Sequence, residues 1–172
     1  MKTFTVQPLA QSQIHAAYPL IREAVPTLDL AAWSRFARLN ADRRRAAHIG
    51  IMVAQRRSRP YPSGLFVYRK DADLQYGLVL TADHFVAIDI IDHRPVVSAL
   101  TESLEALARR LACNAIRSIV RVGSTDVTPG LIGAGYRLEG AILCKQFDRE
   151  AVSDARADFF RIPSEAKLAA NA

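Results

Sequence analysis

One carboxylate stands inside an unusually apolar stretch of the sequence and could act as a catalytic base. Asp89 lies in the run 85–91, which reads FVAIDII. A run this apolar is typical of a strand that is covered on both faces. By strand alternation Asp89 shares a face with Phe85 and Ile91, so its carboxylate should be poorly hydrated. Burial raises the pKa of a carboxyl group toward the range that suits a general base. The structural alternative for Asp89 is an ion pair with one of the many arginines.

The residues that follow form a turn and then a helix that could bind an anion. Asp92-His93-Arg94-Pro95 marks an abrupt turn. The apolar residues after it recur every three or four positions, which is typical of one helix face: Val96, Val97, Leu100, Leu104, Leu107, Ala108 and Leu111. A strand that runs straight into a helix offers an anionic ligand free backbone amides and the positive end of the helix dipole.

Specific groups at this junction can be named. We expect the amides of Val96, Val97 and Ser98 to be free, because they open the helix. The side chains of His93 and Arg94 could add positive charge. Asp92, which begins the turn, places a negative charge nearby that would repel an anion. Its alternative role is to cap the turn, with His93 and Arg94 exposed to solvent.

Other common catalytic centres leave no pattern in this sequence. The two cysteines, Cys113 and Cys144, are far apart and too few for a structural zinc site, which needs four ligands. We therefore expect no metal. The serines and threonines lack the nucleophile-elbow motif. Tyr61, Tyr76 and Tyr136 could each line a substrate cleft, and the sequence does not choose between them.

Positive charge is concentrated in the first part of the chain. The net charge is +6, and residues 1–70 alone hold twelve lysines and arginines against three acidic residues. This asymmetry indicates either an anionic partner, which could be nucleic acid, a phosphorylated cofactor or an acidic substrate, or a solvated arginine-rich face. Nucleic acid is not favoured, because few aromatic side chains accompany these arginines and no helix-turn-helix or zinc pattern occurs. The arginines are Arg35, Arg38, Arg43, Arg44, Arg45, Arg56, Arg57 and Arg59.

The remaining sequence predicts the elements that position these residues. A chain of 172 residues with 50% hydrophobic content suits a single domain with a buried core, which we place at 1–150, followed by a tail at 151–172 with one short helix. The patterns predict strands at 3–8, 47–56, 65–68, 74–80, 78–91, 114–122 and 141–147, helices at 11–25, 29–39, 96–111 and 130–134, loops at 57–64 and 71–73, and a bulge or bend at 81–83.

This order of elements implies a mixed α/β (α+β) fold. Sequential strands with short links form an antiparallel meander. The helix between the central strand and 114–122 implies a right-handed crossover to a parallel neighbour. The N-terminus has no apolar signal segment, and no apolar run approaches the ~20 residues of a membrane span. We therefore expect a cytoplasmic protein without a membrane partner.

The order of elements resembles that of the GNAT superfamily of acyl-CoA-dependent N-acetyltransferases. Residues 21–38 resemble the family's first two helices, and 85–109 resemble its central strand and cofactor-binding helix. Residues 132–147, IGAGYRLEGAILCKQF, resemble its closing turn and last strand, with Tyr136 where phenylalanine is usual. The resemblance implies a GNAT-like, mostly antiparallel sheet flanked by helices. It also implies acetyl-CoA contacts from Ile90, Ile91, His93, Arg94, Val96, Val97 and Ser98.

The sequence departs from the family where the cofactor pyrophosphate would bind. The family pattern there is Gln/Arg-x-x-Gly-x-Gly/Ala. This chain has Asp92 in place of the Gln/Arg and has Pro95 and Val97 in place of the glycines. Cβ atoms crowd the approach of phosphates to the amides. The tyrosine that often serves as general acid would align with Leu131, so that role is missing.

We predict an acyl-CoA-dependent N-acyltransferase that moves an acyl group directly to an amine, with Asp89 as the base and no covalent enzyme intermediate. The main alternative is a non-catalytic binding or regulatory domain of the same fold that has lost CoA chemistry. The expected partners are a small-molecule or peptide amine, with an acidic substrate suiting the basic half, and a second copy of the chain in a homodimer.

Overall fold

A computed structural model describes residues 3–88, 92–120 and 127–145 of the chain. The chain divides into two units, Met1–Arg137 and Leu138–Ala172, and each is described by itself. The predicted boundary between a domain and a tail at residue 150 lies outside the described residues, as does the predicted tail helix.

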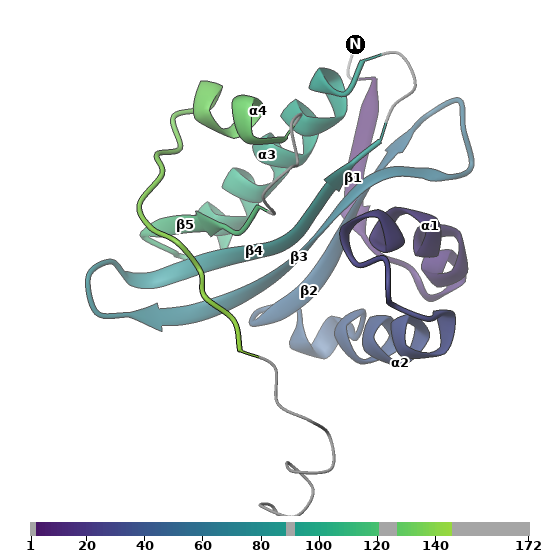
Figure 1. Cartoon of the computed structure of the whole chain (residues 1–172), viewed down its shortest axis with the longest axis horizontal. Coiled ribbons are helices and arrows are strands. Elements are labelled where there is room, and N and C mark those ends of the chain that lie inside the picture. Colours follow the sequence, from purple (N-terminus) through teal and green to yellow (C-terminus); the bar gives the residue numbers. More distant parts are fainter. Residues whose placement is uncertain (1–2, 89–91, 121–126, 146–172) are drawn as a thin grey trace, which may run out of the picture. The chain divides into compact units, whose positions relative to one another are not determined.

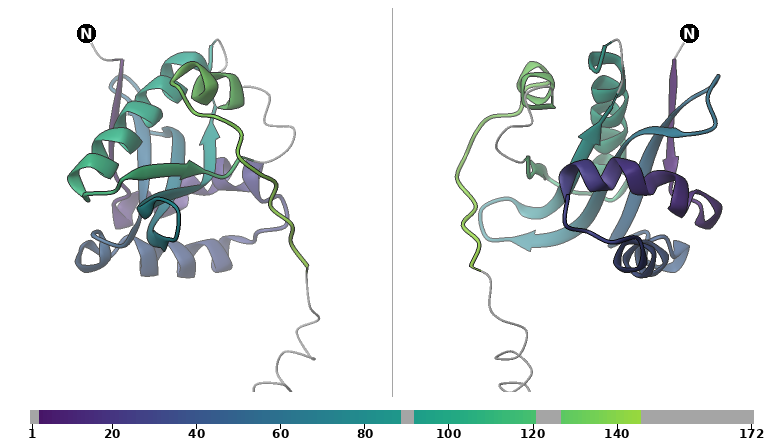
Figure 2. Two further views of the ribbon diagram at one scale, coloured as in Figure 1. Left: turned by 90° about the vertical axis from the view of Figure 1, so that its left-hand side faces the viewer. Right: turned by 45° about the vertical axis from the view of Figure 1, so that its right-hand side comes forward.

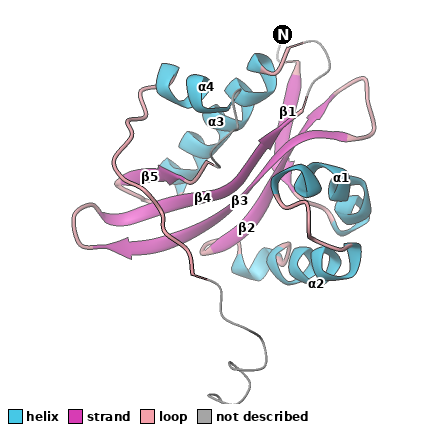
Figure 3. Ribbon diagram, in the orientation of Figure 1, coloured by secondary structure: helices cyan, strands magenta, loops and turns pink. Residues whose placement is uncertain are grey.

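The first unit is built on one five-stranded sheet (Figure 3). Its strands are β1 (Phe4–Pro8), β2 (Ile49–Arg56), β3 (Pro62–Asp73), β4 (Gly77–Ala87) and β5 (Ala115–Ser118), and they lie side by side in sequence order. The first four are antiparallel to their neighbours, and β5 is parallel to β4. The predicted meander and the parallel crossover are therefore confirmed.

Helices cover both faces of this sheet (Figures 1 and 2). The helices α1 (Ile14–Ala24) and α2 (Leu30–Asn40) lie on one face, and α3 (Arg94–Arg110) and α4 (Val127–Gly133) lie on the other. Two short 3₁₀ helices, Gln11–Gln13 and Arg43–Arg45, precede α1 and β2. Each face of the sheet thus has its own apolar core.

The two helical layers are held by different devices. The Asp29 carboxylate caps α2 by accepting from the Ala32 amide at 2.7 Å. The indole Nε1 of the fully buried Trp33 donates to the Ile14 carbonyl at 2.7 Å and so joins α2 to α1. On the other face α3 buries the predicted stripe: Val96, Val97, Leu100, Leu104, Leu107 and Ala108 are each at most 4% exposed.

The strand β3 is longer at both ends than the sequence predicted. The last three residues of the expected loop 57–64 belong to the strand, which begins at Pro62. A proline is tolerated at the first residue of a strand, because its missing amide hydrogen costs the fewest hydrogen bonds between strands there. The expected turn 71–73 is also strand. The reversal comes after it, where the Asp73 carboxylate accepts from the amides of Gln75 and Tyr76 and Gly77 adopts a φ of 77°.

The predicted bulge lies in β4, but later than 81–83. Val67 pairs with Asp83 and Leu65 pairs with Val86, so the single residue Phe66 faces two residues of β4. One of those two, His84, has a φ of 51°, which is the left-handed backbone that a bulge accommodates. Because the extra residue shifts the alternation, Asp83 and Phe85 face opposite sides of the sheet.

The final strand predicted at 141–147 is not observed in the part of it that the structure describes. Residues 138–145 carry no regular secondary structure, and 146–147 lie outside the described residues. Leu138, Ile142 and Leu143 are largely exposed. Alternating apolar residues predict a strand only where a partner strand supplies the hydrogen bonds.

Gly64→Ala should destabilise the protein. A Cβ at Gly64 would lie 2.8 Å from Leu100 Cδ1 and 2.8 Å from the Val86 carbonyl oxygen, which is backbone and cannot move aside. We expect the free energy of unfolding to fall by about 1–3 kcal/mol. Urea denaturation would measure it. Gly133→Ala is the matched control, because nothing lies within 4 Å of a Cβ there. Equal effects of the two variants would contradict this packing.

Candidate functional site

Within the described residues, the strand pairing of β4 is shorter on its β5 side than on its β3 side. On the β3 side β4 is paired up to Ala87. On the β5 side the pairing runs from Val79 to Ala82, with further bonds from the Asn114 amide to the Leu78 carbonyl and from the Ile119 amide to the Ala82 carbonyl. The described pairing of β4 with β5 therefore ends at Ala82. A strand edge that lacks a partner can bind an extended ligand through backbone hydrogen bonds.

The start of α3 is closed by a carboxylate instead of being open to an anion. The Oδ1 atom of Asp92 accepts from the Arg94 amide and from Arg94 Nε, both at 3.0 Å. The Arg94 side chain and then the Arg94 amide hold the pKa of the Asp92 carboxyl below its ordinary value. Asp92 is therefore ionised at neutral pH and places a negative charge on the positive end of the helix.

The prediction of three free amides at this turn is wrong. The helix begins at Arg94, earlier than expected, so the Val97 amide already donates to the His93 carbonyl at 3.0 Å. Ser98 is the fifth helical residue and falls within regular helical bonding. Pro95 has no amide hydrogen. Of the described first-turn amides, the Val96 amide is the one without a described partner.

The side chains of the predicted cofactor site point in different directions. Val96 and Val97 are buried beneath the helix, so only their backbone could meet a ligand. Arg94 is exposed but is held by Asp92. Ser98 is exposed and donates to Glu102 at 3.2 Å. Ile90 and Ile91 lie outside the described residues. For all of these residues a role in holding a cofactor stays a prediction.

The predicted base cannot be placed, whereas a neighbouring carboxylate can. Asp89 lies outside the described residues. Asp83 lies beside the bulge and forms an ion pair with Arg69, which also binds Asp71 at 2.9 Å. This cluster lies on the α1 and α2 face of the sheet, because Asp83 and Phe85 are on opposite faces and Phe85 packs in the α3 core.

Leu131 of α4 is part of the core and is 4% exposed. The sequence predicted that this position lacks a general acid. The burial of Leu131 adds that its side chain is not accessible to a substrate. Gly130 explains the tight fit: a Cβ there would lie 2.6 Å from Val97 Cγ1. The helices α3 and α4 thus pack closely beside the start of α3.

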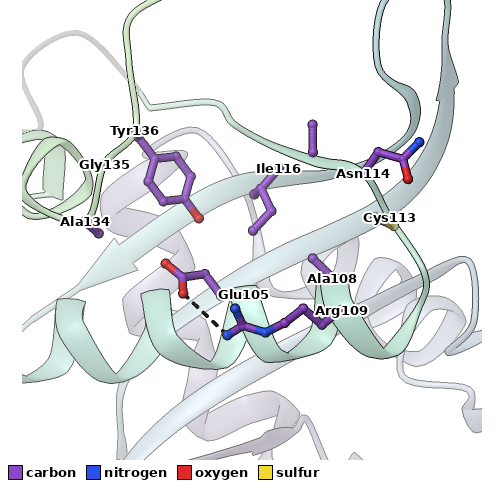
Figure 4. A pocket seen from close by; sticks show the side chains of 10 residues that line it. Glu105, Ala108, Arg109, Cys113, Asn114, Ile116, Ala134, Gly135 and Tyr136 are labelled. Carbon is purple, nitrogen blue, oxygen red and sulfur yellow. Dashed lines mark ion pairs between the residues drawn. The ribbon is translucent and has the colours of Figure 1, made fainter.

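Two adjoining hollows form a groove along α3. The first, of about 410 Å³, lies between Val97, Thr101 and Glu102 of α3 and Gly130 and Gly133 of α4. The second, of about 360 Å³, continues past the C-terminal half of α3 to Ile116 of β5 and Tyr136 (Figure 4). Both hollows are lined by Glu105 and Ala134, and together we call them the α3 groove.

The α3 groove contains two hydroxyl groups without a partner among the described residues. Thr101 is 4% exposed, and its Oγ1 has no hydrogen-bond partner. The buried phenol oxygen of Tyr136 has none either. Figure 4 shows the Tyr136 hydroxyl directed toward α3, where Glu105 pairs with Arg109 at 3.5 Å. Burial, and then the charge of Glu105, raise the pKa of Tyr136 to about 12, so this hydroxyl is protonated at neutral pH.

Sequence reasoning named Tyr136 among three tyrosines but missed Thr101. A threonine on the apolar stripe of a helix was the available signal. Tyr61 is 68% exposed on the β2–β3 loop and Tyr76 lies at the β3–β4 turn, so neither lines the α3 groove.

The arginine-rich segment does not form one surface. Arg44 and Arg45 precede β2, whereas Arg56 is its last residue and Arg57 and Arg59 follow it. The eight residues of β2 separate the two groups by roughly 23 Å at about 3.3 Å per residue. A single nucleic-acid footprint would need these charges side by side. No group of three potential metal ligands and no helix that could cross a membrane occurs among the described residues.

No family model and no curated protein matches the sequence. Many solved structures do match the fold. Glucosamine-6-phosphate N-acetyltransferase from Arabidopsis thaliana is 12% identical, with a TM-score of 0.68, and the match covers 85% of this chain and 99% of that one. The aminoglycoside N-acetyltransferase AAC(6')-Iy in complex with CoA is 10% identical, with a TM-score of 0.70 and coverage of 84% and 94%.

A third structure, ribosomal-protein-alanine N-acetyltransferase from Brucella melitensis biovar Abortus 2308, is 12% identical, with a TM-score of 0.67 and coverage of 84% and 99%. At these identities the likeness concerns the fold.

Asp92→Asn should remove the negative charge at the start of α3 and keep the hydrogen bond that this side chain accepts from the Arg94 amide. An asparagine can still accept from the Arg94 amide, but it carries no charge for Arg94 or the helix dipole. Since the folded pKa of Asp92 lies below its unfolded value, its stabilising effect is present above the unfolded pKa and is lost as pH falls through the folded pKa. Unfolding free energies of wild type and variant should differ at pH 7 and converge in acid. A difference independent of pH would contradict the assignment.

The strand order, the crossover and the placement of the helices agree with these structural matches, so the chain has the fold of the GNAT N-acetyltransferases.

Proposed function

We propose that this protein is an N-acyltransferase that transfers an acyl group from a CoA-type thioester, with acetyl-CoA as the donor to test first, directly to an amine. The observation that carries the proposal is the edge of β4 beyond Ala82, where the described pairing with β5 ends next to a bulge, in a fold whose matched structures include N-acetyltransferases. An extended thioester arm is a ligand that such an edge can hold.

The reaction would need little from the protein besides positioning. The amine nitrogen attacks the thioester carbonyl, a backbone amide of the β4 edge beyond Ala82 donates to the developing oxyanion, and the C–S bond breaks as the C–N bond forms. A carboxylate takes a proton from the substrate ammonium, which frees the nitrogen lone pair for the attack, and the thiolate leaves as the C–S bond breaks. A thiol has an ordinary pKa of about 8.5, so its thiolate can leave without an acid. The absence of a tyrosine at Leu131 is compatible with this chemistry.

The diphosphate of CoA does not fit the described residues at the start of α3. A phosphate would meet the ionised Asp92 carboxylate, the ring of Pro95 and a Val97 amide already in use. We therefore assign no step to the nucleotide part of the donor.

The proposal is tested by incubating the protein with acetyl-CoA and a panel of small amines and N-terminal peptide amines, and by following release of free thiol. We expect thiol release that depends on one class of amine, and native-state stabilisation by the donor, which reaches about 2.7 kcal/mol at a hundredfold excess over the Kd. Neither thiol release nor stabilisation at millimolar donor would overturn the proposal.

The base is tested with two aspartate variants. Asp89→Asn should lower kcat by ~10²-fold or more with donor affinity preserved, because proton transfer is lost while binding is not. Asp83→Asn is the control, because Arg69 already holds that carboxylate on the α1 and α2 face of the sheet. A loss of kcat in Asp83→Asn with normal turnover in Asp89→Asn would move the base to Asp83.

A second candidate function is a non-catalytic binding or regulatory domain. The observation that favours it is the same Asp92 carboxylate, which occupies the Arg94 amide where the fold would otherwise receive an anion. Under this reading the donor does not stabilise the protein and no amine is acylated. The cytoplasmic location and the homodimer expected from the sequence stay predictions, as does the acidic acceptor.

A further inference from the structure

The acyl donor of this protein can be narrowed further, on the basis of the proposed function. We propose that the chain recognises the pantetheine arm of its donor and does not recognise the nucleotide. Its substrate class is then pantetheine thioesters in general, whether the arm is free, part of CoA or carried by an acyl carrier protein.

The charge along α3 does not favour a phosphate-bearing ligand. The start of the helix carries the Asp92–Arg94 pair, and Glu102, Glu105 and Arg109 follow along the α3 groove. Carboxylates therefore outnumber guanidinium groups by one along this path. Phosphates bind where free amides, helix dipoles and unpaired arginines converge. The tail of CoA bears a diphosphate and a further phosphate, whereas this path offers the Val96 amide alone among the described first-turn amides, beside the ionised Asp92 carboxylate and an Arg94 that is already paired with it.

The α3 groove offers space and hydrogen-bonding groups to an uncharged chain. One wall includes Gly133 and Ala134, and nothing lies within 4 Å of a Cβ built at Gly133, so a chain has room to lie against the backbone there. Thr101 lines the other wall, and its buried hydroxyl has no hydrogen-bond partner among the described residues. A buried polar group that lacks a partner costs stability, so a group that completes its hydrogen bond would bind favourably.

The chemistry of the pantetheine arm matches the groups of the α3 groove. Pantetheine is a narrow, uncharged chain with two amides and two hydroxyl groups, separated by short apolar pieces. Its amide hydrogens suit the acceptors Thr101 Oγ1 and Glu105, and its carbonyls suit the Tyr136 hydroxyl, which is protonated at neutral pH. These groups therefore suit a donor site that binds the pantetheine arm and does not require the nucleotide.

The deciding experiment compares acetyl-CoA, acetyl-pantetheine and acetylated acyl carrier protein as donors under one set of conditions. We expect kcat/KM for acetyl-CoA and acetyl-pantetheine to agree within a few-fold. A site that bound the diphosphate would favour CoA by on the order of 100-fold, because each charge-assisted hydrogen bond contributes about 1.5–3 kcal/mol. A preference for CoA of that size would overturn the inference. A preference for the carrier-borne donor would identify the source of the arm.

Binding gives a readout that does not depend on turnover. Pantetheine and CoA should raise the melting temperature by similar amounts, and adenosine 3′,5′-bisphosphate, the nucleotide half of CoA, should not raise it. Stabilisation by the nucleotide alone would overturn the inference. Turnover with a strong preference for CoA would leave the proposed function standing, whereas pantetheine binding without acylation of any amine would leave only the inference standing. No binding by any probe would remove both.

Two variants locate the site. Thr101→Val keeps the shape of the side chain and removes the unpartnered hydroxyl, so it should maintain or raise the melting temperature while weakening pantetheine and CoA equally, by ~5-fold or more. A merely structural Thr101 would lose stability instead. Thr128→Val is the control, because Thr128 is an exposed threonine of α4 that does not line the α3 groove. Unchanged pantetheine affinity in Thr101→Val would remove the α3 groove from donor recognition.

Discussion

The packing of α3 against the sheet is the constraint on which the rest of this structure depends. Val96, Val97, Leu100 and Leu104 are each at most 2% exposed, and Gly64 of β3 lies directly beneath the first of them. Burying one such side chain contributes about 1.5–3 kcal/mol, so the register of the helix on the sheet is strongly determined. The position of the helix start relative to the bulged end of β4 follows from that register.

The same packing explains why the start of α3 is a poor receptor for phosphate. Valines at 96 and 97 fill the space between helix and sheet, whereas glycines would let a ligand approach the amides. Asp92 then supplies the acceptor that the first turn needs, through the Arg94 amide. The Arg94 and Val97 amides of this first turn are thus satisfied by the chain itself, and the Asp92 carboxylate opposes the approach of an anion. The chain has the fold of the matched N-acetyltransferases, with this turn closed by its own carboxylate.

Under the proposed function, the acyl donor would be held by the β4 edge and the α3 groove. The described pairing of β4 with β5 ends at Ala82, and the α3 groove contains the buried hydroxyls of Thr101 and Tyr136. Donor selection by the arm, with the nucleotide left outside, is consistent with every described contact in this region. Such selection would widen the range of donors and leave acceptor choice to the opposite face, where Arg69, Asp71 and Asp83 are already paired.

The sequence by itself determined the elements whose signals are local. The three- and four-residue spacing of Val96, Leu100 and Leu104 predicts α3, and the missing glycines at 95 and 97 predict the altered turn, because each depends on neighbouring residues only. Tertiary structure decided the rest. The bulge at His84 exists through the pairing of β4 with β3, and the helix starts at Arg94 because Asp92 folds back on it. The hydroxyls of Thr101 and Tyr136, which have no partner among the described residues, lie along one groove because α3, α4 and β5 converge there, although 35 positions separate them in the sequence. Pairings over such distances follow from the packing of whole elements, which no local pattern encodes.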